Sequence, residues 1–320
     1  MKNIFLYIFV VIVLIFFVPY FVVSVKGIKN EKGIKQEENT ISVYIKDEDI
    51  VLDIPMEEYI INVVCAEMPA LFETEALKAQ AVAARTYTVS KIKANKNEEI
   101  LKAHKNAQIC TDSTHCQAYM SKDEAYKKWG KDADSFYQKI SDAVLLTKGE
   151  ILTYQNEPIQ AVFHSSNSGR TENAKDVWGR DFEYLVSVVS DGEDLSPRYE
   201  NEYVTTYENF KNIILNEYPD IDESKFVDNI TYTRGGAVDS INIFGKSIKG
   251  TKVRQMFKLS SANFEIKKEN DIVTFKSYGY GHGVGMSQYG ANFMASEGKN
   301  YKQILENYYN GTTILMYNPR

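Results

Sequence analysis

The sequence has 320 residues, of which 44% are hydrophobic and 25% are charged, a balance typical of a folded globular protein rather than a disordered one. This length allows one large hydrophobic core or two moderate ones. The formal net charge is −6, and the lysines and arginines are scattered instead of forming one basic stripe, which argues against DNA or RNA as a partner.

Residues 4–25 form an uncharged segment rich in Ile, Val, Phe and Leu, long enough to span a bilayer as a helix. No small residues that would mark a cleavage site follow it, so we interpret residues 1–25 as an uncleaved membrane anchor rather than a cleaved signal peptide. More lysines follow this segment than precede it, and the positive-inside rule would therefore keep the rest of the chain in the cytoplasm. Long domains can translocate despite such a bias, so charge alone does not set the orientation.

A polar linker without apolar periodicity is predicted at residues 26–40, and the folded domain at residues 41–320. Apolar residues alternate along residues 41–54 on both sides of a charged turn, which predicts a β-hairpin.

Pro55 is predicted to open a helix that Asp53 caps and that ends at Pro69. A longer helix follows at residues 74–93, and its many alanines permit the close approach of a neighbouring element. Residues 101–118 show neither helical nor strand periodicity and are interpreted as a loop.

Ser121 and Glu124 form a capping box for the next helical stretch, which reaches Leu146 and is open to interruption at Gly130. Strands are predicted at residues 150–154, 159–164, 184–189, 229–233, 237–244, 264–267 and 272–276. Short helices are predicted near residues 207–217, 251–258, 286–297 and 300–308. Helices and hairpins intermingle without regular strand–helix alternation, which predicts the α+β class.

Glu67 lies at the C-terminus of the first predicted helix, directly before the Met-Pro turn. An anion is unfavourable there because the helix dipole is negative at that end and apolar neighbours exclude water; both effects raise the pKa of a carboxyl group. A carboxyl group that stays protonated near neutral pH can act as a general acid. On this segment alone, a solvated surface glutamate is the alternative.

Two later segments combine glycine with small polar side chains. Residues 163–171 (FHSSNSGRT) predict a loop after a strand that can approach a polyhydroxylated ligand, with a plain polar turn as the alternative. Residues 278–290 (YGYGHGVGMSQYG) let the backbone bend around His282 before a helix begins. No Gly-Lys-Ser/Thr follows and no βαβ unit surrounds this loop, which excludes nucleotide binding.

In this order, the three segments resemble the stage II sporulation protein D family, which includes amidase-enhancer-like proteins. The resemblance rests on Glu-Met-Pro at Glu67 with EALKAQAVAARTY at residues 75–87, on the HSS and GRT groups, and on GHGVGMSQYGA, and it extends over residues 45–316. It implies a lytic transglycosylase of septal wall remodelling and engulfment, anchored in the mother-cell membrane with its body outside the cytoplasm and facing the septum. It also implies an amidase/endopeptidase partner and a membrane scaffold.

The resemblance further implies that the enzyme cleaves peptide-free peptidoglycan strands between N-acetylmuramic acid and N-acetylglucosamine, with Glu67 as the catalytic acid. Glu67 would protonate the bridging oxygen, and the muramoyl 6-hydroxyl would then form a 1,6-anhydro sugar; no water, second carboxylate or catalytic cofactor is needed, unlike in most glycosidases. An enhancer or scaffold that binds glycan without cutting it is the alternative. We expect residues of the motifs to hold the sugar: Arg85, His164, Ser165, Ser166, Gly169, His282, Ser287, Gln288 and Tyr289.

The loop at residues 101–118 contains four potential metal ligands: His104, Cys110, His115 and Cys116. Four such side chains suffice for a closed tetrahedral zinc site, which would offset the conformational entropy of a segment with little apolar content. A Cys110–Cys116 disulfide is the alternative outside the cytoplasm, and two free thiols are a third. Zinc or a disulfide would be structural here. Cys65 is expected to be a buried apolar residue rather than a ligand.

Overall fold

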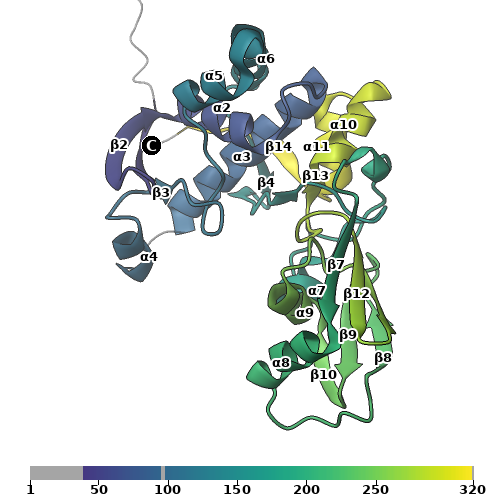
Figure 1. Ribbon diagram of the computed structural model, residues 1–320. Coiled ribbons are helices and arrows are strands. Elements are labelled where there is room, and N and C mark those ends of the chain that lie inside the picture. Colours follow the sequence, from purple (N-terminus) through teal and green to yellow (C-terminus); the bar gives the residue numbers. More distant parts are fainter. Residues whose placement is uncertain (1–38, 95–97, 319–320) are drawn as a thin grey trace, which may run out of the picture. The chain divides into compact units, whose positions relative to one another are not determined.

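The computed structural model describes residues 39–94 and 98–318, and one compact unit begins at Thr40 (Figure 1). The predicted anchor at residues 1–25, and the predicted linker up to residue 38, lie outside the described residues. Within the described part of the chain, no helix combines the length and the apolar character needed to cross a bilayer.

A small three-stranded sheet opens the unit. β1 (Thr40–Ile45) and β2 (Ile50–Pro55) form the predicted antiparallel hairpin. β3 (Ile109–Cys110) pairs parallel with β1 on its other side, so the predicted loop at residues 101–118 contains a short strand, and α4 (Glu98–Ala103) enters its beginning. A two-residue strand is too short to leave a periodic signal in the sequence.

Four helices cover the first core: α2 (Met56–Glu67), α3 (Thr74–Ala94), α5 (Lys122–Trp129) and α6 (Ala133–Leu145). The N-cap residue of α2 is Pro55, and no described side chain bonds to its free N–H groups, so the expected cap by Asp53 is wrong. Ser121 and Glu124 form the predicted capping box. A 3-10 turn that starts at Gly130 separates α5 from α6, as predicted.

α3 is the central helix of the first core, where five of its alanines are fully buried: Ala76, Ala79, Ala81, Ala83 and Ala84. The C-terminal α10 (Gln288–Ser296) and α11 (Tyr301–Tyr308) pack against α3. β14 (Thr313–Met316) pairs antiparallel with β4 (Glu150–Tyr154), which also pairs with β5 (Glu157–Pro158). The first core is therefore built from elements near both ends of the described chain.

Residues 200–278 build a second core from two antiparallel sheets (Figure 1). The first sheet has the strand order β11 (Phe264–Glu269), β12 (Ile272–Tyr278), β7 (Glu200–Thr206), and the second has the order β10 (Lys246–Lys249), β9 (Val238–Ile243), β8 (Val227–Tyr232). α8 (Tyr207–Glu217) and α9 (Gly250–Phe257) join this core, where Phe210 stacks on Phe257.

The architecture confirms the α+β class and contains one large core and one smaller core. The strand predicted at residues 184–189 is wrong, because that stretch forms only an isolated bridge between Val189 and Arg170. β7 was not predicted, since its polar residues hide the alternation on which such a prediction depends.

Candidate active site

A groove of about 1240 Å³ lies along the first core and collects residues from all three sequence motifs. Glu67 enters it from the end of α2, Ser165 from the HSS segment and His282 from the glycine loop. Gln288, the first residue of α10, joins them, and residues 113–118 line another part of the groove. The fold thus brings together segments that are far apart in the sequence.

The Glu67 side chain is half-buried at the point where α2 stops and Met68 turns to an extended conformation. The Ala118 N–H donates a hydrogen bond of 2.9 Å to Glu67 Oε1, and Gln288 provides a second hydrogen bond. Burial raises the pKa of Glu67 above its usual value, and the two hydrogen bonds lower it by a smaller amount. The shift favours the protonated form relative to an exposed carboxyl group, which is the direction that a general acid requires.

Two short parallel strands place the second motif beside the third. β6 (Phe163–His164) pairs with β13 (Met286–Ser287). Gly285 precedes β13 with a φ of 72°, and a Cβ atom there would lie 2.1 Å from the Val162 carbonyl oxygen. Only glycine allows the two backbones to approach this closely.

His164 and His282 lie close together in the groove wall, with ring centroids 5.8 Å apart. Burial, and then the charge of the neighbouring Arg254, lowers the pKa of His282 to about 4, while burial and then His282 lower the pKa of His164 to about 3. Both imidazoles are neutral near pH 7 and act there as hydrogen-bonding groups rather than as charges.

The buried Glu193 side chain links the HSS segment to the glycine loop segment through hydrogen bonds. No sequence motif indicated this role. Glu193 accepts hydrogen bonds from the backbone N–H of Asn167 at 2.9 Å and from Ser287 Oγ at 2.9 Å. Asn167 Nδ2 lies 3.0 Å from Glu193 Oε1 and 3.1 Å from His164 Nε2. Desolvation by burial raises the pKa of Glu193 to about 7.

Five of the predicted sugar-binding residues line the groove with Glu67: His164, Ser165, His282, Gln288 and Tyr289. The expectation is wrong for Ser166, Gly169 and Ser287, which do not line it. Ser166 is buried beside a separate small cavity, and the Gly169 N–H bonds to the Asn167 side chain. Ser287 is fully buried and caps α10 by accepting a hydrogen bond from the Gly290 N–H.

Arg85 is also not a groove residue, which corrects the expectation that it contacts the sugar. Its side chain is 0% exposed, and its guanidinium donates to both Glu57 oxygens, at 3.0 and 2.6 Å. The same guanidinium also donates hydrogen bonds to the carbonyl oxygens of Val144 at 3.2 Å and Glu150 at 3.1 Å. Arg85 therefore joins α2, α3, α6 and β4.

Aromatic side chains that were not among the expected sugar-binding residues also line the groove: Tyr87, Trp129, Phe136 and Trp178. Trp178, at the end of α7 (Ala174–Trp178), is 42% exposed, and its ring centroid lies 5.1 Å from that of His282. Exposed aromatic faces beside neutral hydrogen-bonding groups suit the apolar faces and hydroxyl groups of a sugar.

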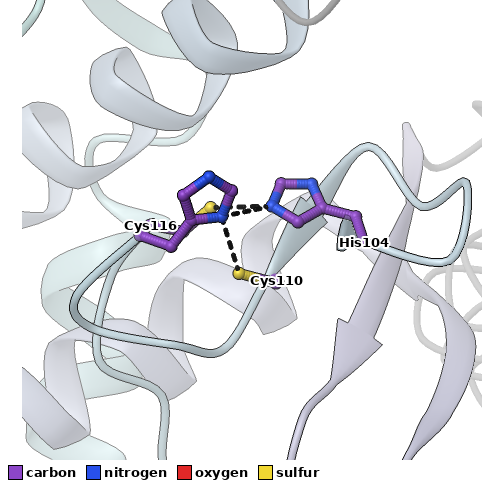
Figure 2. A group of neighbouring side chains, drawn as sticks. His104, Cys110 and Cys116 are labelled. Atoms are coloured by element: carbon purple, nitrogen blue, oxygen red, sulfur yellow. Dashed lines mark hydrogen bonds between the residues drawn. The ribbon is translucent and has the colours of Figure 1, made fainter. Parts of the chain in front are cut away.

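The four predicted metal ligands converge beside this groove, and Figure 2 labels three of them: His104, Cys110 and Cys116. Their ligand atoms all lie within 4.8 Å of one another, and the three cysteines in the described residues are free thiols. Cys110 Sγ lies 3.6 Å from His115 Nδ1, and Cys116 Sγ lies 3.7 Å from His104 Nε2. Tetrahedral zinc, with bonds of about 2.0 Å to nitrogen and 2.3 Å to sulfur, needs nitrogen–sulfur separations of about 3.5 Å, which these two pairs match. His104 Nε2 and His115 Nδ1 lie 2.7 Å apart, closer than the roughly 3.3 Å between two nitrogens on one ion, so zinc binding requires the two rings to move slightly apart. Cys65 is buried and stands apart from them, as expected.

Comparison with known proteins gives this site its family context. The family model described as stage II sporulation protein matches residues 44–154. Stage II sporulation protein D of Bacillus subtilis is 43% identical over 287 residues, 89% of this chain and 82% of the relative. The chain belongs to the stage II sporulation protein D family. The Bacillus amyloliquefaciens member is 40% identical over 89% of this chain and 81% of its own length.

A more distant relative of this chain is the amidase enhancer of Bacillus subtilis. It is 28% identical over 80% of this chain and 40% of the relative. The segment that the family model matches contains Glu67 and the four ligand residues, whereas the β6–β13 wall of the groove lies beyond it.

Proposed function

We propose that this protein is a peptidoglycan lytic transglycosylase that cleaves the bond between N-acetylmuramic acid and N-acetylglucosamine in peptide-free strands. The observation that carries the proposal is the Glu67 carboxyl group, half-buried in a long groove with a raised pKa. Membership in a family of sporulation proteins supports action in septal wall remodelling and engulfment.

In the proposed reaction, the Glu67 proton passes to the bridging oxygen as the glycosidic bond breaks. The carboxylate then takes the proton of the muramoyl 6-hydroxyl, whose oxygen bonds to the anomeric carbon and closes the 1,6-anhydro ring. Gln288 and the Ala118 N–H hold the carboxyl group in place through hydrogen bonds. His164 and His282 are uncharged and form part of the groove wall beside the sugar, while their ring nitrogens bond to Asn167, Val284 and Phe163.

The test is incubation of the full-length protein, in detergent micelles, with purified peptide-free glycan strands. Mass spectrometry of the products should show fragments that end in 1,6-anhydro-N-acetylmuramic acid. Fragments with ordinary reducing ends would indicate a hydrolase and contradict the proposed chemistry.

The alternative is a glycan-binding enhancer or scaffold for a cell-wall amidase, which the similarity to an amidase enhancer favours. The same incubation separates the two functions. Strands that bind but stay intact, together with stimulation of a partner amidase, would support the enhancer.

We also propose that His104, Cys110, His115 and Cys116 hold one structural zinc ion. The convergence of four nitrogen and sulfur donors supports this, and a closed set of four leaves no open position for a substrate. The ion would order residues 113–118, which line the groove. Elemental analysis should find close to one zinc per chain; metal-free protein with a Cys110–Cys116 disulfide would contradict the proposal.

We further propose a single-pass protein of the mother-cell membrane, with residues 1–25 as the anchor and the folded body facing the septum. The expected partners are glycan strands, a sporulation amidase/endopeptidase and a membrane scaffold of the engulfment machinery. Family membership and the uncharged N-terminal segment support this placement. Protease accessibility of the body in intact sporulating cells tests the orientation.

A further inference from the structure

The charged side chains that line the groove are mainly positive, although the protein as a whole is negatively charged. The chain carries a formal net charge of −6, yet the groove is lined by three permanent cations: Lys128, Arg198 and Arg254. Glu67 is the single carboxyl group among the described lining residues, and its pKa is raised. A cationic groove in an acidic protein indicates a ligand that carries negative charge.

Arg254 is the most informative of these cations because it is half-buried and unpaired. It lies in the last turn of α9, where its Nε donates a hydrogen bond of 3.3 Å to the Leu259 carbonyl oxygen. Within residues 39–94 and 98–318, neither Arg254 nor Arg198 takes part in an ion pair, although many surface lysines do. A partly desolvated guanidinium without a carboxylate is costly unless a ligand supplies one.

Arg254 lies near the two histidines of the groove wall. Its charge lowers the pKa of both His282 and His164, so all three side chains lie within electrostatic reach of one another. Arg198 lies over the Tyr280 ring, 5.0 Å from its centroid, and Tyr280 also lines the groove. Tyr280 is also within electrostatic reach of Arg254, so both arginines lie near this exposed ring.

We propose that Arg254, assisted by Arg198, binds the free carboxylate of an acidic sugar in the groove. This inference rests on the proposed function. A muramoyl unit carries a lactyl carboxyl group that is an uncharged amide while a peptide is attached and becomes a carboxylate once the peptide is removed. Arginine can bind such a group through two parallel hydrogen bonds. The arginines thereby favour peptide-free strands through a charge that appears only after removal of the peptide.

The test measures binding to two matched ligands: peptide-free glycan strands, and the same strands after their carboxyl groups are converted to methylamides. Full-length protein with Glu67→Gln is used in micelles so that neither ligand is cut. We expect the amidated strands to bind about tenfold more weakly, since a hydrogen bond to a charged group contributes on the order of 1.5 kcal/mol. The preference should shrink as salt is raised.

Arg254→Gln in the same background should lose most of the preference for the unmodified strands, and Arg198→Gln should lose a smaller part of it. Arg198 is exposed, so its substitution tests the inference even if Arg254→Gln fails to fold. Lys252→Gln is the matched control, because Lys252 lies on the same helix but pairs with Glu217 and does not line the groove. Equal binding of the two ligands before substitution, or full preference in both arginine variants, would overturn the inference. The proposed function fails separately, through the absence of anhydro products.

Discussion

Substitution of Glu193 by Gln tests whether this buried carboxyl group is the pH-sensitive part of the groove wall. Four donor groups converge on its two oxygens, from Ser190, Ser287, the Asn167 backbone and the Asn167 side chain. A glutamine side chain in this position would offer one acceptor oxygen and would turn an NH2 group towards donors. The substitution should therefore destabilise the protein by an amount that does not depend on pH.

The substitution also has a pH-dependent effect on stability, which follows from the pKa of Glu193. Burial raises the pKa of Glu193 from 4.5 to about 7, so the folded protein binds this proton more tightly than the unfolded chain does. The stabilisation is fully present below the unfolded pKa and is lost as the pH rises through the folded pKa. From about pH 5 to about pH 7.5, the loss in the free energy of unfolding is about 2 kcal/mol.

The assay is urea unfolding of both proteins at the two pH values. Raised pKa values at Glu67 and Glu172 add to the loss in the wild type, and lowered values at His164 and His282 oppose it. These groups are common to both proteins, so only the difference between wild type and variant isolates Glu193. A difference that changes by less than about 0.5 kcal/mol between the two pH values refutes the reasoning.

Three further substitutions or treatments have definite expected outcomes. Glu67→Gln should lower the rate of anhydro-product formation at least about a hundredfold while glycan binding persists, and a wild-type rate would remove Glu67 as the acid. Arg85→Met should lower the free energy of unfolding by about 3–5 kcal/mol in urea, because it leaves the Glu57 carboxylate unpaired next to buried carbonyl groups; a near-neutral effect would contradict the structural role of Arg85. Zinc chelation should lower the melting temperature and speed hydrogen exchange at residues 100–120, and unchanged values in both measurements would count against the metal.

Local signals in the sequence predicted the local parts of the fold. The capping box at Ser121 and Glu124 and the hairpin at residues 41–54 need only neighbouring residues, and both are confirmed. The parallel pairings of β3 with β1 and of β6 with β13 join distant residues through two-residue strands. Such strands are too short for a periodic pattern, so only the folded chain reveals them.

In the candidate site, too, features that depend on neighbouring residues could be predicted, and features that depend on distant residues could not. The position of Glu67 at a helix end could be read from adjacent residues, and its pKa is raised as that position suggested. Arg85 and Ser287 lie in motifs, but a motif does not tell a buried supporting residue from one that faces the groove. Glu193 belongs to no motif, since its role depends on Asn167 and Ser287, which are 26 and 94 residues away.

The pairing of β6 with β13 has a consequence for the order in which parts of the protein fold. The contact between Ser165 and Ser287 closes a loop of 122 residues that contains the whole second core. Loop closure of this length is entropically costly and is expected late in folding. A chain still emerging from a ribosome would already contain Glu67 while lacking the part of the groove wall that β13 and the glycine loop form. Any function that needs the complete groove therefore requires nearly the whole chain.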